Sequence, residues 1–334
     1  MVITKTPFRM SFFGGGTDFP DFYNEHGGAV LSTTFDKYCY VNVRHLPPFF
    51  DYSSEISYSE IERVKSTDEI KHPSVRECMK YYDMRDIRLT YEADLPARTG
   101  LGTSSSFAVG MLSAFHALKG KLKDKKSLAE EAIHLERVLC NEAGGVQDQI
   151  AVAFGGLNRI DFSAAGFQVN PITISNERKN RLNSNLMMFF TGFSRFSSEI
   201  QTSTQSAIKE NDKVKQLLEM YSLVDEAQKI LVDKDADLDD FGRLLDHTWR
   251  LKRGISGRIS TNTLDGIYER AISCGALGGK LLGAGGGGFF VFYVQPDKQD
   301  EVLAGLKDLL YIPFKFENDG VSTIYYSAED YDLK

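Results

Sequence analysis

The stretch Pro96–Ser106, PARTGLGTSSS, combines glycines and hydroxyl side chains in a pattern that could bind phosphate. Gly100 and Gly102 allow a tight turn that brings the backbone close to a ligand. The residues from Thr103 to Ser106 stand at the expected start of a helix, where unpaired N–H groups and the helix dipole attract anions. The Gly-Lys-Ser/Thr of a Walker A loop is missing. The stretch therefore predicts either another kind of phosphate-binding loop or an ordinary, well-capped strand-to-helix connection.

Two acidic side chains further along the chain are candidates for catalysis and metal binding. Asp148, in NEAGGVQDQ, follows a Gly-Gly turn and precedes an apolar run, so it is either a helix cap or a general base for a substrate hydroxyl. Glu136 shares a partly apolar helix face with Ile133 and Cys140. Its carboxylate could bind Mg²⁺, which takes carboxylate, hydroxyl and phosphate oxygens. The alternative is a flanking charge paired with Arg137.

Two further glycine-rich segments could face a ligand. The first, TPFRMSFFGGGTD from Thr6 to Asp18, presents a hydroxyl and a carboxylate after three glycines, and its Arg9 could pair with an anion. A turn with an Asx cap is the alternative. The second, KLLGAGGGGFF from Lys280 to Phe290, lies between apolar runs, which is untypical of a flexible linker. It indicates either a close backbone approach to a ligand or another loop, or a buried tight turn.

The elements that must position these segments alternate between strands and helices. Strands are predicted at 29–44, 87–94, 186–190, 288–294 and 313–326, helices at 108–118, 127–142 and 298–310, and a hairpin at 157–172. The polar stretch 175–184 is the best candidate for a domain boundary. We therefore expect an α+β architecture with one domain at 1–175 and a second at 185–334.

The composition is that of a soluble globular protein. The 334 residues are 42% hydrophobic and 25% charged, which suffices for two packed domains. A net charge of −7 disfavours binding to nucleic acid or to an anionic membrane. No apolar run approaches the length of a membrane span, and the beginning, MVITKTPFRM, lacks a signal-peptide core. Four scattered cysteines argue against a zinc site or a disulfide framework and predict a cytoplasmic protein.

The three glycine-rich segments together resemble the motifs of the GHMP kinase superfamily. PARTGLGTSSS resembles its phosphate-binding loop, LLGAGGGGFF resembles its C-terminal glycine motif, and TPFRMSFFGGGTD occupies the place of its N-terminal substrate motif. The resemblance covers the chain from Thr6 to Phe290. It implies a GHMP kinase fold, with an N-terminal domain like ribosomal protein S5 domain 2 and a ferredoxin-like C-terminal domain.

Within the superfamily, FFGGGTDFPDFYNEHGGAVLSTTFDKYCYV and GGVQDQ resemble most the D-glycero-D-manno-heptose 7-phosphate kinases, and next the L-fucose kinases. Galactokinases have Glu-His where this chain has Gly15 and Gly16, which disfavours galactose. The resemblance implies ATP-dependent phosphorylation of the anomeric C1 hydroxyl of the heptose 7-phosphate, giving the 1,7-bisphosphate. The alternatives are a kinase of an unphosphorylated sugar such as L-fucose or galactose, and a non-catalytic regulator that binds sugar and ATP.

The resemblance also implies the roles of single residues. Asp148 is the catalytic base and Arg9 keeps it ionised, while Ser104 and Glu136 bind Mg²⁺. The match requires one extra residue between Glu136 and Asp148, so Glu142 is a second candidate for the metal. The expected binding residues are Gly100, Leu101, Gly102, Thr103, Ser104, Ser105 and Ser106 for ATP, and Gly15, Gly16, Thr17, Asp18, Gly285 and Gly286 for the substrate.

A heptose 7-phosphate carries a dianion far from its C1 hydroxyl, so the pocket needs a fixed cation there. Lys37, Arg44, Arg98 and Arg195 are the candidates, and a surface charge is the alternative for each of them. The expected partners are a small sugar phosphate and ATP, with neither nucleic acid nor membrane. The chain is expected to act as a monomer or a homodimer.

Overall fold

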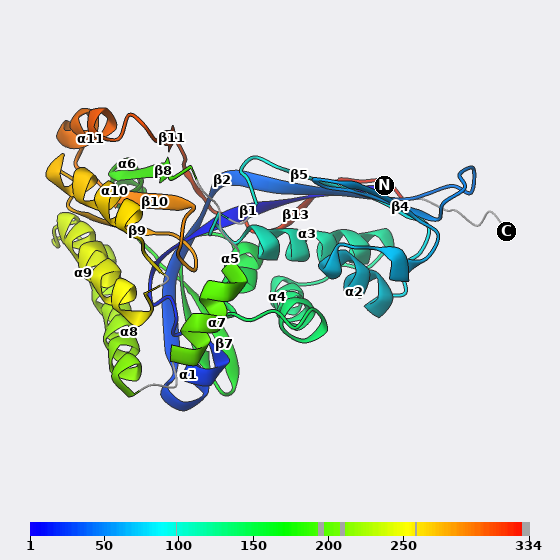
Figure 1. Cartoon of the computed structure of the whole chain (residues 1–334), viewed down its shortest axis with the longest axis horizontal. Helices are drawn as coiled ribbons and strands as arrows, with labels where there is room; N and C mark the ends of the chain where they lie inside the picture. The colour runs from blue at the N-terminus through cyan, green and yellow to red at the C-terminus, as the bar shows by residue number, and fades with distance from the viewer. Residues whose placement is uncertain (98, 193–196, 208–210, 258, 329–334) are drawn as a thin grey trace.

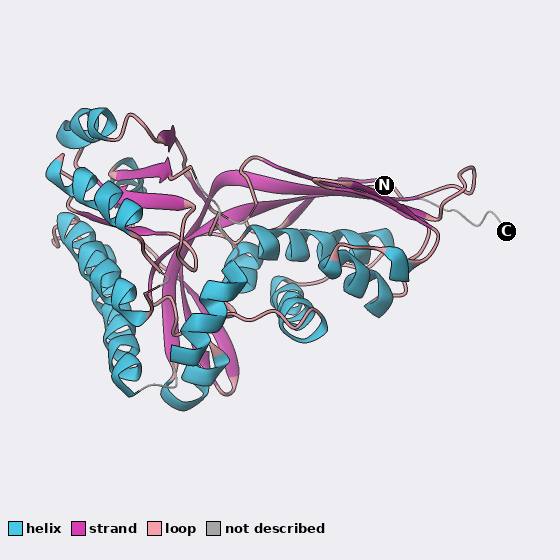
Figure 2. Ribbon diagram, in the orientation of Figure 1, coloured by secondary structure: helices cyan, strands magenta, loops and turns pink. Residues whose placement is uncertain are grey.

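The computed structural model describes the chain except for Arg98, residues 193–196, residues 208–210, Arg258 and residues 329–334. The described residues form two β-sheets, each covered by helices (Figure 1). Helices and strands alternate through both halves of the chain, which confirms the predicted α+β class (Figure 2). No helix in this described part is both long and apolar enough to cross a membrane.

The larger sheet contains nine strands in the described residues. They are β1 (Val2–Phe13), β2 (Gly28–His45), β3 (Ser54–Ser57), β4 (Ile61–Val64), β5 (Ile87–Ala93), β6 (Asn158–Ser163), β7 (Gly166–Pro171), β12 (Phe316–Glu317) and β13 (Ser322–Tyr326). The main path runs β13-β1-β2-β5-β3-β4, and all neighbours on it are antiparallel except β3 and β5. One part of β2 pairs with β5 and another part with β6, so this long strand connects the two ends of the sheet.

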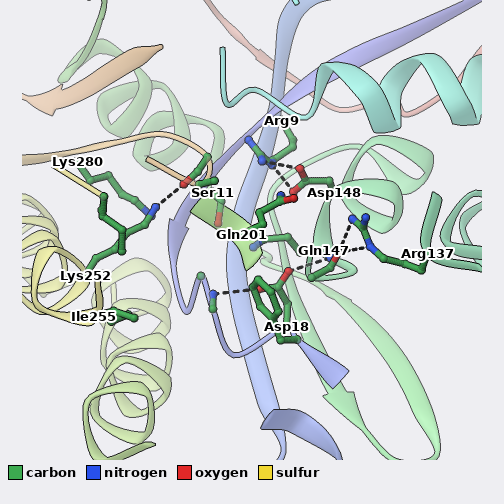
Figure 3. Close-up of a pocket in the computed structure, with 17 residues that line it drawn as sticks. Arg9, Ser11, Asp18, Arg137, Gln147, Asp148, Gln201, Lys252, Ile255 and Lys280 are labelled. Atoms are coloured by element: carbon green, nitrogen blue, oxygen red, sulfur yellow. Dashed lines mark hydrogen bonds and ion pairs between the residues drawn. The ribbon is translucent and has the colours of Figure 1, made fainter. Parts of the chain in front are cut away.

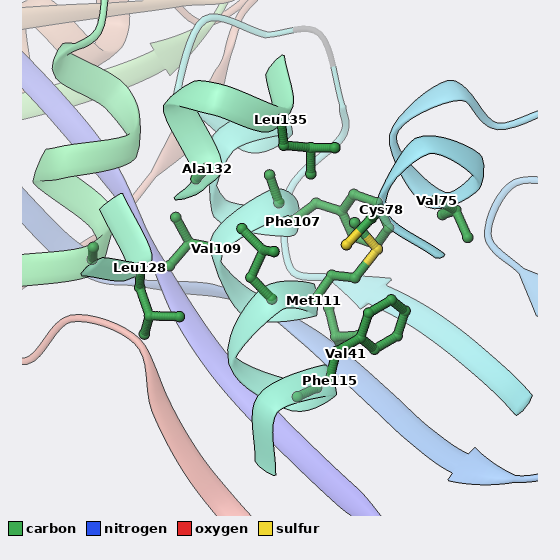
Figure 4. Packing of buried hydrophobic residues seen from close by; sticks show 14 of the residues in the cluster. Val41, Val75, Cys78, Phe107, Val109, Met111, Phe115, Leu128, Ala132 and Leu135 are labelled. Carbon is green, nitrogen blue, oxygen red and sulfur yellow. The ribbon is translucent and has the colours of Figure 1, made fainter. Parts of the chain in front are cut away.

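Helices from the first half cover one face of the larger sheet. They are α1 (Pro20–His26), α2 (Pro73–Tyr81), α3 (Thr103–Leu118), α4 (Lys125–His134), a π-helix (Leu135–Leu139) and α5 (Gln147–Phe154). The buried face of α3 packs Phe107 and Met111 between the sheet and the neighbouring helices (Figure 4). Helix α3 lies close to β1 because Gly110 faces this strand; a Cβ there would stand 2.8 Å from the Thr6 hydroxyl. The burial of this face fixes the start of α3 beside β1.

The smaller sheet has the strand order β11-β8-β10-β9 and is antiparallel. Its strands are β8 (Leu186–Phe190), β9 (Gly278–Leu281), β10 (Phe289–Tyr293) and β11 (Leu310–Ile312). The helices of this half are α6 (Asn176–Ser184), α7 (Ser197–Ala207), α8 (Asn211–Val232), α9 (Asp239–Ile255), α10 (Asn262–Ser273) and α11 (Gln299–Gly305). Both β9 and β10 are buried along their whole length, and the glycine-rich segment joins them.

Several predicted elements differ from the structure in their extent. The polar stretch 175–184 contains helix α6, which follows β7 of the larger sheet and precedes β8 of the smaller sheet along the chain. The predicted helix 127–142 is divided, because α4 passes into the π-helix after His134. The predicted strand 313–326 is two short strands, β12 and β13, which pair with β2 and β1. The end of the chain therefore returns to the larger sheet. Residues 185–334 thus contribute strands to both sheets and not to the smaller sheet alone.

Candidate active site

The predicted phosphate loop connects β5 to α3. Gly102 is the N-cap residue of α3, with a left-handed φ of 73°, and as a glycine it has no side chain to cap the helix. The hydroxyl residues therefore do not cap the helix as the sequence suggested, because α3 already begins at Thr103. The Ser106 hydroxyl instead donates to the Pro7 carbonyl at 3.0 Å, and the Leu101 carbonyl accepts a hydrogen bond from β1. The loop is thus fastened to β1 with the first amides of α3 beside it.

Glu136 is 1% exposed and contacts the first turn of α3. The Ser104 and Ser105 hydroxyls each donate to one of its carboxylate oxygens at 2.8 Å, and the Gln149 amide donates as well. Glu136 lies in the π-helix, whose wider turn accommodates one extra residue. The family resemblance requires one extra residue between Glu136 and Asp148, and the π-helix lies at the start of this segment. The alternative interpretation of Glu136 as a flanking charge paired with its neighbour is therefore not supported.

Asp148 lies in the first turn of α5, where Val146 is the N-cap residue, so Asp148 is not the cap. Arg9 donates from Nε and Nη2 to the two carboxylate oxygens of Asp148, both at 2.7 Å (Figure 3). Its Nη1 donates to the Gly100 carbonyl at 2.6 Å. The side chain of Arg9 is 5% exposed and that of Asp148 is 22% exposed. Arg9 therefore holds a partly accessible carboxylate against the phosphate loop.

Asp18 fixes the turn after β1 to the start of α5. Its carboxylate accepts from the amides of Gly16 at 3.0 Å and Gln147 at 3.2 Å. Burial and the neighbouring charge of Asp148 raise the pKa of Asp18, and the two backbone hydrogen bonds oppose this rise. A Cβ at position 145 would stand 1.9 Å from the Asp18 carboxylate, so only Gly145 permits this contact. The carboxylates of Asp18 and Asp148 both line the same cleft.

The C-terminal glycine segment packs its backbone against the phosphate loop. Gly100 and Gly283 have positive φ angles of 80° and 75°. A Cβ on Gly283 would stand 2.3 Å from the Gly100 Cα, and a Cβ on Gly288 would stand 2.1 Å from the Thr99 carbonyl oxygen. The sequence left open whether this glycine segment approaches a ligand or another loop. In the structure its backbone approaches the phosphate loop. Gly283 thus positions Gly100, whose carbonyl accepts a hydrogen bond from Arg9.

A cleft of about 690 Å³, open to solvent, lies beside Asp148 (Figure 3). Its lining includes Gly15, Gly16 and Asp18. Three other residues expected to bind substrate do not line it. Thr17 is buried with its hydroxyl donating to the carbonyls of Gly14 and Ala29 at 2.8 and 2.9 Å, while Gly285 and Gly286 lie against Ile259. Gly283 and Ala284 line the cleft instead.

Two of the four basic residues proposed from the sequence, Lys37 and Arg44, do not line this cleft. Lys37 lies 3.3 Å from the Asp36 carboxylate, and Arg44 donates to the carbonyl of the next residue. Arg98 and Arg195 lie outside the described residues. The described residues contribute other cations to the lining, namely Arg9, Arg137, Lys252 and Lys280.

Sequence reasoning overlooked Lys252 and Lys280 because each lies within an apolar pattern. Lys252 is on the buried face of α9, three residues from both Trp249 and Ile255 and seven residues, or two turns, from Leu245. Lys280 is in the fully buried strand β9. The sequence did contain a signal for these residues. Each lysine stands at a position that helical or strand periodicity assigns to the core, and an ammonium group is costly to bury without a function.

Comparison with known proteins defines the family. Residues 70–156 match the GHMP kinases N terminal domain, and residues 225–312 match the GHMP kinases C terminal domain. The chain belongs to the GHMP kinase family. The matched regions contain the phosphate loop, Glu136, Asp148 and the glycine segment that packs on the loop, so the family assignment and the geometry of the site agree.

Three relatives are informative. The D-glycero-alpha-D-manno-heptose 7-phosphate kinase of Campylobacter jejuni is 29% identical over 96% of this chain and 98% of its own length. The L-fucokinase/L-fucose-1-P guanylyltransferase of Bacteroides fragilis is 24% identical over 89% of this chain but only 35% of its own. A crystal structure described as a D-glycero-D-manno-heptose 1-phosphate kinase from Bacteroides thetaiotaomicron has a TM-score of 0.79 over 98% of this chain and all of its own, at 24% identity. This last similarity establishes the shared fold.

Proposed function

We propose that this chain is an ATP-dependent kinase that phosphorylates the anomeric C1 hydroxyl of D-glycero-D-manno-heptose 7-phosphate. The bidentate pair of Arg9 and Asp148 carries the proposal, because it stands between the phosphate loop and the cleft that contains Asp18. A non-catalytic binding protein has no need of a carboxylate placed at this junction. The nearly full-length similarity to the Campylobacter heptose 7-phosphate kinase supports the choice of sugar.

In the proposed reaction, the phosphates of ATP lie at the loop Gly100–Ser106 and the sugar lies in the cleft. The C1 hydroxyl proton passes to an Asp148 carboxylate oxygen while the C1 oxygen of the sugar attacks the γ-phosphorus. The new O–P bond forms as the bond to the β,γ-bridging oxygen breaks, which releases ADP. Arg9 orients Asp148 through two hydrogen bonds, and Asp18 accepts hydrogen bonds from sugar hydroxyls. Most of the rate should come from positioning and electrostatic stabilisation.

The residues at the start of α3 fit a Mg²⁺ ion. Ser104 and Glu136 bring a hydroxyl and a carboxylate together, and Mg²⁺ typically takes one or two carboxylates and completes its octahedron with phosphate oxygens and water. Bound there, the ion would neutralise charge on the transferred phosphoryl group.

An ADP-release assay over a panel of sugars tests the proposal. The panel contains D-glycero-D-manno-heptose 7-phosphate, the 1-phosphate, the free heptose, L-fucose and galactose, and Asp148→Asn serves as the inactive control. We expect the highest kcat/KM for the 7-phosphate. A higher value for L-fucose or another unphosphorylated sugar would replace the heptose proposal with the fucokinase alternative. Binding of sugar and ATP without ADP release would support the regulator.

A further inference from the structure

Two buried lysines form one wall of the cleft. Lys252 comes from α9 and is 8% exposed, and Lys280 comes from β9 and is 2% exposed (Figure 3). They lie on different elements, yet both side chains reach the cavity that contains Asp18 and Asp148. An isolated buried ammonium group is costly, so two of them in one wall need an explanation.

The partners of these lysines within the protein are neutral. Among the described residues, the Nζ of Lys252 donates to the Gly283 carbonyl, and the Nζ of Lys280 donates to the Phe12 carbonyl at 2.8 Å. An ammonium group has three donors, so each lysine retains donors for a ligand. The Ser11 hydroxyl also lines the cleft, and it is buried without a hydrogen-bond partner in the described part of the chain. These groups together provide donors for an anion.

The electrostatics of the wall favour the binding of an anion. Burial lowers the pKa of Lys252 to about 8, and the positive charge of Arg9 contributes to this shift. Burial also lowers the pKa of Lys280 well below its usual value, with the charges of Lys252 and Arg9 adding to the effect. The carboxylates of Asp18 and Asp148 oppose the shift at Lys252. A dianion between the two lysines would favour the charged form of both.

The wall lies on the side of the sugar rather than on the side of the nucleotide. Among the described residues that line the cleft, none belongs to the phosphate loop Gly100–Ser106, and Glu136 is also outside the lining. The lysines instead share the cavity with Gly15, Gly16 and Asp18. The nucleotide phosphates have their own donors at the start of α3, so a second phosphate-binding wall implies a second phosphate.

We propose that Lys252 and Lys280, with Ser11, bind the phosphate group that the sugar substrate already carries. The inference rests on the proposed function and adds to it the residues that distinguish a sugar phosphate from a free sugar. Two lysines act as point charges on a dianion, and the Ser11 hydroxyl donates a further hydrogen bond. This wall takes the place of the cations that the sequence alone suggested, Lys37 and Arg44.

The test compares substrates that differ only in their phosphate. Lys252→Gln and Lys280→Gln remove the charge but retain an amide that can donate to the same carbonyl. We expect each to raise KM for heptose 7-phosphate about ten- to hundredfold, from the loss of a charge-assisted contact. KM for the free heptose and for ATP should stay within about twofold. Lys37→Gln, outside the cleft, is the matched control and should change none of the three.

The outcomes separate the inference from the proposed function. Unchanged KM for the 7-phosphate, or an equal rise for free heptose, would overturn the inference and leave the kinase proposal intact. A rise in KM for ATP alone would also overturn it, because the lysines would then serve the nucleotide. A wild-type enzyme that prefers a free sugar would instead refute the proposed function. Should the glutamine variants not fold, Lys252→Arg and Lys280→Arg should retain the preference for the 7-phosphate, and its loss would overturn the inference.

Discussion

The site has two regions that could bind phosphate. We call the start of α3 with its loop the nucleotide side and the cleft lined by Asp18, Lys252 and Lys280 the sugar side, and the two differ in their hydrogen-bond donors. On the nucleotide side, the donors are the first amides of α3 and neutral hydroxyls, with Ser104 already bonded to Glu136. On the sugar side, they are the buried ammonium groups of Lys252 and Lys280. The ion pair of Arg9 and Asp148 stands between the two.

The difference has consequences for how each side responds to its surroundings. Backbone dipoles and hydroxyls keep their polarity across the physiological pH range and need no counter-charge when unoccupied. Buried ammonium groups are costly without an anion and lose their charge as pH rises. We therefore expect nucleotide binding to be insensitive to mild alkali, and sugar phosphate binding to depend on pH and strongly on the charge of the ligand.

The largest effect is expected at the junction of the two sides. Asp148→Asn should lower kcat about a hundred- to ten-thousandfold, because a positioned base supplies roughly that factor. The Kd for ATP should change less than about twofold, because we propose that the phosphate loop, and not Asp148, binds the nucleotide. Single-turnover kinetics and ATP titration measure the two quantities. A variant with wild-type kcat would return Asp148 to a structural role.

The metal requirement tests the nucleotide side. Ser104→Ala and Glu136→Ala should each raise the Mg²⁺ concentration for half-maximal rate, by about tenfold or more. Glu142→Ala is the control, because its carboxylate is 42% exposed and lies 4.0 Å from Arg137 rather than on α3. The reverse pattern for the two glutamates would show that the π-helix does not place Glu136 as a metal ligand.

A third prediction concerns the contact that braces the phosphate loop. Gly283→Ala would place a Cβ 2.3 Å from the Gly100 Cα at a residue with φ of 75°, so the free energy of unfolding should fall by about 1–3 kcal/mol. Denaturant unfolding measures it. Gly266→Ala in α10 is the control, since a Cβ there meets nothing within 4 Å, and it should be neutral or slightly stabilising. Equal stability of the two variants would refute the bracing contact.

The smallest effect is the pH dependence of the sugar side. Lys252 binds an anion in its protonated form, and its pKa is lowered to about 8, so KM for the sugar phosphate should rise as pH increases above 8. The rise should be no more than about tenfold per pH unit, since one proton is lost. KM for ATP should stay level over the same range. An equal rise in Lys252→Gln would assign the titration to another group.

The strand, glycine turn and helix that form the predicted phosphate loop could be predicted from the sequence because they are contiguous. Glycines, hydroxyl side chains and the apolar pattern of a helix follow one another within Pro96–Leu118, and local geometry places them together. The pairing of Arg9 with Asp148 depended on the family resemblance, because 139 residues separate them. The π-helix at Glu136 was not predicted, because the apolar pattern of residues 127–142 is that of a continuous α-helix.

The sugar side could not be assembled from local patterns. Lys252 and Lys280 approach β1 only after α9 and β9 pack in the second half of the fold, and each lies in an otherwise apolar pattern. The return of β13 to β1 was missed for the same reason, because strand pairing over such a distance leaves no local signal. Long-range packing, rather than propensity, decides these features.

The position of the transferred phosphoryl group tests the central claim most directly. Phosphorus NMR of the product from wild-type enzyme, ATP and D-glycero-D-manno-heptose 7-phosphate reports it. We predict one new sugar phosphate resonance coupled to the anomeric proton, with the C7 phosphate retained. A new phosphate on any other carbon, or ADP formed without a sugar bisphosphate, would contradict the account.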